Sequence, residues 1–204
     1  MKRAWMAVVA MAAAATACSG GQNSLTVALY DYSGMPPWVL RSATQEAREA
    51  LRSAGAETQW IFDPHSDQPL PSPLVVVKIM PTRRGIAPEG SSDLGLTARA
   101  PIAQGYATCW VFYRPIQEFA TNVEQPLEEV LGYAIVHEIG HAMGLGHNAF
   151  GIMKADLRKR DLLNAGRLRF PPDDARKIRA TMAIWTTQTA AAGAAERKES
   201  RDPR

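Results

Sequence analysis

Three of the four histidines in this chain lie in one short stretch, residues 137–147, which reads HEIGHAMGLGH. His137 and His141 are four residues apart, so on a helix their side chains lie on one face, about one turn apart, and can reach a single ion. Gly144 can adopt a positive φ without steric cost, which lets the helix end and the chain return His147 to the same ion. The spacing therefore predicts a metal site with three nitrogen ligands.

The donor set indicates a catalytic zinc ion rather than a structural one. Three protein ligands leave one tetrahedral position open, whereas structural zinc sites close the shell with four protein ligands, usually including Cys. The stretch contains no Cys. Glu138 lies about 100° around the helix from His137, where its carboxylate can act as general base on a water that the zinc ion activates. We therefore expect Zn²⁺ as the cofactor and hydrolysis as the chemistry.

The same stretch, followed by Asn148 and then by Gly151-Ile152-Met153, resembles the metzincin clan of zinc endopeptidases and is most similar to its matrixin branch. The resemblance implies that the three histidines hold one catalytic zinc ion, that Glu138 is catalytic, and that Met153 belongs to a tight turn beneath the ligands. An ordinary core methionine is the alternative for Met153. Asn148 departs from the Ser that matrixins commonly carry after the third histidine. All five Tyr precede the motif, so the Tyr that some other metzincin branches place after the Met turn is missing, which favours the matrixin-like interpretation.

The rest of the chain predicts an α+β fold. Apolar spacing predicts helices over residues 37–54 and 126–143 and a final helix that begins at Pro172. This order matches the metzincin-like zincin fold that the resemblance implies: a twisted mixed sheet of about five strands, two helices of which one carries the motif, and a small C-terminal subdomain ending in a helix. The predicted strands are residues 25–30, 58–62, 74–80, 94–98 and 105–113.

The first 17 residues are predicted to be a signal peptide, with a charged start, a short apolar run and a small-residue cleavage region. Cys18 follows directly, so the junction resembles a bacterial lipoprotein box and implies that Cys18 is lipidated and anchors the protein to a membrane. Ordinary secretion after cleavage before Cys18 is the alternative. We thus expect an exported cell-envelope lipoprotein, or else a secreted protein, with residues 18–24 as a flexible tether, 25–185 as one catalytic domain and 186–204 as a disordered tail.

The mild net charge of +3 comes with no nucleic-acid signature, so we expect a peptide or protein substrate, no nucleic-acid partner and a monomer. In the family an extended peptide pairs with the edge strand above the active-site helix. The residues that stand in that place, and that we expect to bind substrate, are Leu94, Gly95, Leu96, Thr97 and Ala98.

The segment after the Met turn is rich in Lys and Arg. In the family this segment helps form the pocket for the side chain just past the cleaved bond, so a preference for acidic substrate residues is one hypothesis. A solvated basic loop is the favoured alternative.

The sequence thus predicts a zinc-dependent endopeptidase. The competing hypothesis is a non-catalytic zinc-binding lipoprotein that uses a metzincin fold as a binding module. Retention of Glu138 argues against the second hypothesis, because a purely structural zinc site has no use for a general base.

Overall fold

The computed structural model describes residues 24–65, 67, 69–88, 93–98, 106–155, 157–163 and 169–199. The predicted signal peptide, Cys18 and the tether up to residue 23 lie outside them. The elements in chain order are β1 (Ser24–Asp31), α1 (Pro37–Ser53), β2 (Glu57–Phe62), β3 (Leu74–Met80), β4 (Gly95–Ala98), β5 (Tyr106–Phe112), α2 (Tyr113–Val123), α3 (Leu127–Ala142), α4 (Lys159–Leu163) and α5 (Pro172–Glu199).

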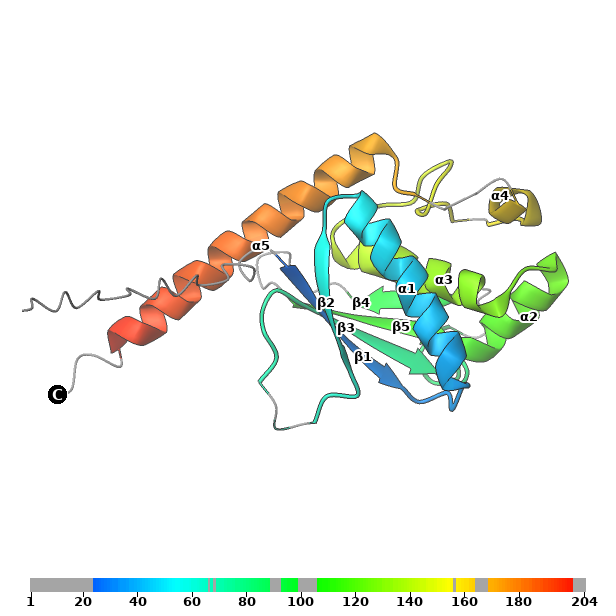
Figure 1. Cartoon of the computed structure of the whole chain (residues 1–204), viewed down its shortest axis with the longest axis horizontal. Coiled ribbons are helices and arrows are strands. Elements are labelled where there is room, and N and C mark those ends of the chain that lie inside the picture. Colours follow the sequence, from blue (N-terminus) through cyan, green and yellow to red (C-terminus); the bar gives the residue numbers. More distant parts are fainter. Residues whose placement is uncertain are drawn as a thin grey trace, which may run out of the picture.

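The five strands form one mixed sheet in the order β2-β1-β3-β5-β4. Four of them run parallel, and β4 pairs antiparallel with β5 at the edge of the sheet. Helices α1 and α3 lie side by side across one face (Figure 1). The α+β fold predicted from the sequence, with its five-stranded mixed sheet and its C-terminal helix, is therefore confirmed.

Side-chain alternation explains why the helices cover this face. In a strand, successive side chains point to opposite faces of the sheet. Every second residue of the central strands joins the buried core between the sheet and the two helices: Leu25, Val27, Leu29, Val75, Val77, Ile79, Ala107, Cys109 and Val111. These apolar residues provide the hydrophobic surface that holds α3 in a fixed position above the sheet.

Helix α2 was not predicted from the sequence. The predicted fifth strand extended to Tyr113, whereas in the structure this residue begins the helix. Ile116, Phe119, Ala120 and Val123 follow the i, i+3, i+4, i+7 spacing of an amphipathic helix, and all four pack against or within the core. The sequence therefore contains an amphipathic pattern for this helix, but the pattern covers only about two turns.

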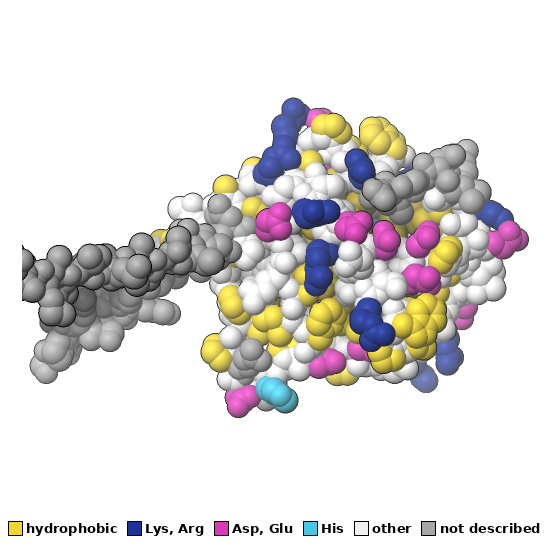
Figure 2. All heavy atoms as spheres, in the orientation of Figure 1, with side chains coloured by type: hydrophobic (Ala, Val, Ile, Leu, Met, Phe, Trp, Pro, Cys, Tyr) yellow, Lys and Arg dark blue, Asp and Glu magenta, His cyan; other side chains and the backbone are white. Residues whose placement is uncertain are grey.

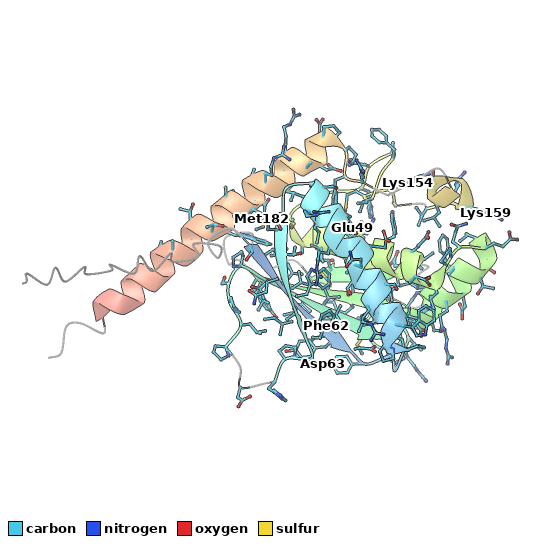
Figure 3. All side chains as sticks on the ribbon, viewed as in Figure 1. Glu49, Phe62, Asp63, Lys154, Lys159 and Met182 are labelled. Carbon is cyan, nitrogen blue, oxygen red and sulfur yellow. The ribbon has the colours of Figure 1, made fainter. Side chains whose placement is uncertain are left out.

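Helix α5 is longer than predicted and extends into the segment that the sequence predicts to be a disordered tail. The buried stripe of α5 ends near Trp185, and the sequence beyond it shows no amphipathic period. The helix nevertheless continues to Glu199 and projects away from the sheet (Figure 1). Residues 186–199 are rich in Ala, the strongest helix former, so local propensity can sustain a helix where periodicity predicts none. Met182, labelled in Figure 3, is buried and marks the part of α5 that packs on the domain.

Two surface features bear on partners. On the face shown in Figure 2, described side chains of both charge signs are interspersed with apolar ones, so no continuous basic patch of the kind that nucleic acid requires covers this face. Within the part of the chain that the structure describes, no helix is both long enough and apolar enough to cross a membrane.

Gly132 lets α1 and α3 approach closely. A Cβ atom at this position would lie 2.8 Å from the Ala43 carbonyl oxygen and 3.0 Å from the Glu46 Cβ. We expect Gly132→Ala to destabilise the fold by about 1 to 2 kcal/mol, because overpacking costs about 1–3 kcal/mol and the gain in helix propensity of about 1 kcal/mol offsets part of it. The melting temperature should fall by a few degrees in circular dichroism, by about 2–4 °C per kcal/mol.

Gly146→Ala is the matched control for Gly132→Ala. A Cβ at Gly146 meets no heavy atom within 4 Å. Both proteins should be melted in the presence of a chelator, so that metal binding does not contribute to the difference. Equal melting temperatures for the two variants would contradict the close-packing interpretation.

Candidate metal centre and active site

The structure brings the three histidines of the motif together. Helix α3 presents His137 and His141 on one face and ends at Ala142. Gly144 follows with a φ of 89°, the positive value expected from the sequence, and the chain turns back to place His147 beside them. One ligand atom from each imidazole lies within 4.8 Å of the others. The described residues contain no other group of three such side chains.

Two backbone carbonyl groups set the orientation of the rings. The Nδ1 atom of His137 lies 2.7 Å from the Ile152 carbonyl oxygen, and that of His141 lies 2.9 Å from the Leu145 carbonyl oxygen. Because a carbonyl oxygen only accepts, each Nδ1 carries the proton, and each Nε2 presents a lone pair in the neutral ring. This is the arrangement by which outer partners orient metal-binding histidines.

The geometry fits a zinc ion. The Nε2 atoms of His141 and His147 are 3.1 Å apart. Two nitrogen ligands at tetrahedral positions around zinc are separated by about 3.3 Å, given Zn–N bonds of about 2.0–2.1 Å. Burial lowers the pKa of His137 to about 4, so that this ring is neutral at neutral pH and available as a ligand. The three histidines are positioned to hold one zinc ion.

Met153 packs directly beneath the helix that carries the ligands. It is fully buried, and a Cβ added to Gly140 would collide with its Sδ atom. The absence of a side chain at Gly140 lets the methionine approach the helix between His137 and His141. The resemblance predicts a packing role for Met153 beneath the ligands.

Helix α5 anchors the chain on either side of the third histidine. The side chain of Asn148 donates a hydrogen bond to Asp174 in the first turn of α5. The Thr181 hydroxyl donates to the Met143 carbonyl oxygen at 3.0 Å. The segment that carries His147 is thus fixed by side chains from the final helix, and Asn148, which departs from the matrixin pattern, has a defined structural partner.

Glu138 lies on α3 with its carboxylate turned toward β4. Its side chain is buried, and Oε2 accepts a hydrogen bond of 2.6 Å from the Thr97 hydroxyl. Burial raises the pKa of Glu138 to about 7, the Thr97 hydrogen bond acts in the opposite direction, and Asp93 adds to the increase. A carboxylate with a pKa near the working pH can both accept and return a proton efficiently.

A cleft of about 520 Å³ contains the histidines and Glu138. Of the five residues predicted to bind substrate, Leu94, Gly95, Leu96 and Thr97 line the cleft, whereas Ala98 is exposed and is not part of its wall. The opposite wall comes from α2, α3 and the segment after the Met turn, through residues that the sequence had not singled out: Phe119, Tyr133, Ala134, Ala155 and Leu157. The i, i+3, i+4, i+7 pattern of α2 is the signal that could have found Phe119.

Two basic side chains after the Met turn are paired with acidic ones. Lys154, on the wall of the cleft, lies 2.5 Å from the Asp161 carboxylate, and Lys159 lies 2.5 Å from that of Glu124 (Figure 3 labels both lysines). Their charge is therefore balanced within the protein. The ion pair with Asp161 weakens any attraction of Lys154 for an acidic substrate residue.

Fold and site together resemble the architecture of zincin-like metallopeptidases. A mixed sheet lies under a helix that carries two of three histidine ligands, and a buried methionine follows the third. The model of the zincin-like metallopeptidase family matches residues 91–160, which run from just before β4 to the start of α4.

Among solved structures, archaemetzincin from Methanopyrus kandleri is similar, with a TM-score of 0.52 over 80% of this chain and 97% of that chain, at 13% sequence identity. At this identity the likeness shows a shared fold. No curated protein matches the chain by sequence. The family match and the histidine site support a zinc-dependent metallopeptidase.

Cys109 lies directly behind the active-site helix. It is fully buried, and its thiol donates to the Glu138 carbonyl oxygen at 3.5 Å. Burial raises the pKa of Cys109 to about 12, so the reactive thiolate is scarce at ordinary pH. We test this burial in a Cys18→Ser variant, treated at about pH 8 with a reagent that reacts with thiols by disulfide exchange. We expect no labelled thiol in the folded protein and one labelled thiol per chain in concentrated guanidinium chloride. Rapid labelling of the folded protein would contradict this burial.

Proposed function

We propose that the protein is a zinc-dependent endopeptidase that hydrolyses internal peptide bonds. One observation carries the proposal: the three imidazoles converge in the same cleft as a buried carboxylate with a raised pKa, Glu138, beside the edge strand of the sheet. The resemblance of the motif and its buried methionine to matrixins supports the finer assignment.

The chemistry divides between the metal and Glu138. A zinc ion held by His137, His141 and His147 would polarise the scissile carbonyl group and lower the pKa of a coordinated water. Glu138 would take a proton from the attacking water and then pass it to the nitrogen of the leaving amine. Its burial supports this role, because a carboxylate with a pKa near 7 exchanges its proton readily around neutral pH.

The substrate would bind as an added strand. Among the described residues, the edge strand β4 has a neighbour, β5, on one side only, and Leu94, Gly95 and Leu96 line the cleft along it. An extended peptide that pairs with this edge would gain affinity from backbone hydrogen bonds. Such pairing can continue on both sides of the cleaved bond, which supports cleavage within a chain rather than at its end.

Replacement of Glu138 tests the proposed activity. We expect Glu138→Ala to bind about one zinc per chain, as the wild type does, and to lose hydrolysis by at least about 100-fold, the range for loss of a general base. Zinc is measured by plasma mass spectrometry, and cleavage by mass spectrometry of the fragments of an unfolded protein substrate. Internal fragments indicate an endopeptidase.

Glu129→Ala provides the matched control. Glu129 is an exposed glutamate in the first turn of the same helix, and its replacement should leave both zinc content and hydrolysis unchanged. If zinc-loaded wild type cleaves none of a broad set of substrates, the proposal fails and the alternative, a non-catalytic zinc-binding lipoprotein, is favoured.

We further propose that the protein is exported and lipidated at Cys18. The charged and apolar N-terminus and the small residues before Cys18 support this proposal. We expect the mature protein from a bacterial host to begin at Cys18, to carry acyl groups in intact-mass spectrometry and to partition into detergent. A mature N-terminus at Cys18 without added mass would instead support ordinary secretion.

A further inference from the structure

The edge strand β4 contributes a side chain to the site as well as a backbone. Thr97 is directly opposite Cys109 in the pairing of β4 with β5, so its side chain faces α3. The Thr97 hydroxyl lies 2.6 Å from Oε2 of Glu138 and 3.0 Å from the backbone carbonyl oxygen of the same residue. Thr97 and Glu138 are 41 residues apart in the chain. The fold alone brings them together.

The proton of the hydroxyl can be assigned to one of its neighbours. A threonine hydroxyl donates only one hydrogen bond, and the Cys109 thiol is placed to donate to the Glu138 carbonyl oxygen. The carboxylate oxygen is nearest to the hydroxyl, and 2.6 Å is the ordinary length of a hydrogen bond from a hydroxyl to an ionised carboxylate. The Thr97 proton therefore goes to Oε2.

Gly95 supports the same carboxylate from the same face of β4. A Cβ at Gly95 would lie 2.6 Å from Oε1 of Glu138 and 2.6 Å from its Cγ. The strand thus provides a hydroxyl for one carboxylate oxygen and, two residues earlier, an open space for the other. A glutamate side chain has three rotatable bonds. The hydrogen bond from Thr97 holds Oε2, and glycine at position 95 leaves room for Oε1.

We propose that Thr97 is a positioning residue for the general base, whose hydroxyl holds Oε2 against β4 and leaves Oε1, over Gly95, to receive the proton of the attacking water. This role rests on the proposed peptidase function. Placement errors of about 1 Å in a catalytic group can cost about 100-fold in rate. The hydroxyl acts on the reacting atoms through Glu138, whereas the proposed pairing of substrate with β4 uses the backbone of the strand.

Thr97→Val and Thr97→Ser separate the hydroxyl from the shape of the side chain. Valine keeps the β-branched shape that suits a strand and removes the hydroxyl, whereas serine keeps it. We expect Thr97→Val to retain about one zinc per chain and to lower kcat by about 10- to 100-fold with KM changed by less than about threefold. Thr97→Ser should retain kcat within about threefold of wild type. If the valine variant does not fold, Thr97→Ala removes the same hydroxyl.

Thr108→Val is the control. Thr108 lies on the adjacent strand β5, and its hydroxyl pairs with that of Tyr106 at 2.9 Å, away from the site. Its replacement should leave kcat unchanged. A valine variant at position 97 with wild-type kcat, or a serine variant as impaired as valine, would overturn the proposal.

A crystal structure of each variant gives a readout that does not depend on activity. In Thr97→Val the Glu138 carboxylate should leave its wild-type position or occupy several rotamers, while in Thr97→Ser it should stay in place. An unchanged Glu138 in the valine variant overturns the positioning role. If the wild type hydrolyses nothing, the proposed function fails, and the crystal structures still decide whether Thr97 positions Glu138.

Discussion

The hydrogen bonds from imidazole Nδ1 atoms to backbone carbonyl groups are the interactions on which the whole site depends. Helix geometry places His137 and His141 on one face, but it does not determine which ring nitrogen points outward. The Ile152 and Leu145 carbonyl oxygens determine the orientation of the two rings. Both residues lie in the segment that follows the end of α3. The Tyr133 hydroxyl, which donates to the Lys154 carbonyl oxygen at 3.0 Å, adds a third link of the same kind. A metal site with correctly oriented ligands therefore exists only when the segment after the helix has folded back onto it.

The need to hold that segment explains several features that the metal chemistry alone would not. Gly140 leaves the space that Met153 fills. Gly151, with a φ of 78°, has no Cβ to collide with Pro171, which precedes α5. From α5, Asp174 accepts the hydrogen bond of Asn148. The final helix is thus part of the scaffold of the metal centre, although none of its described side chains lines the cleft.

The sheet has a second role beyond supporting the helices. A buried glutamate on an apolar helix is costly unless it has polar partners, and β4 supplies one through the Thr97 hydroxyl. Burial raises the pKa of Glu138 toward neutrality, the direction that suits an acid–base group. The same edge strand that is proposed to pair with substrate therefore also shapes the environment of the base. Binding and chemistry are adjacent because one short strand serves both.

The sequence by itself determined the features that depend on local spacing. The ligand set follows from the i, i+4 geometry of a helix and the freedom of Gly144, and the strands follow from short apolar runs. Helix α2 and the extension of α5 were missed because one has a short pattern and the other relies on alanine propensity without a period. Only the tertiary structure decided the contacts between distant segments. It brought Thr97 to Glu138, Asn148 to Asp174, and Asp161 to Lys154. The sequence had not shown whether Lys154 has an acidic partner. Local patterns specify which residues share a face, whereas the partner of each face is fixed only when the sheet, α3 and α5 pack together.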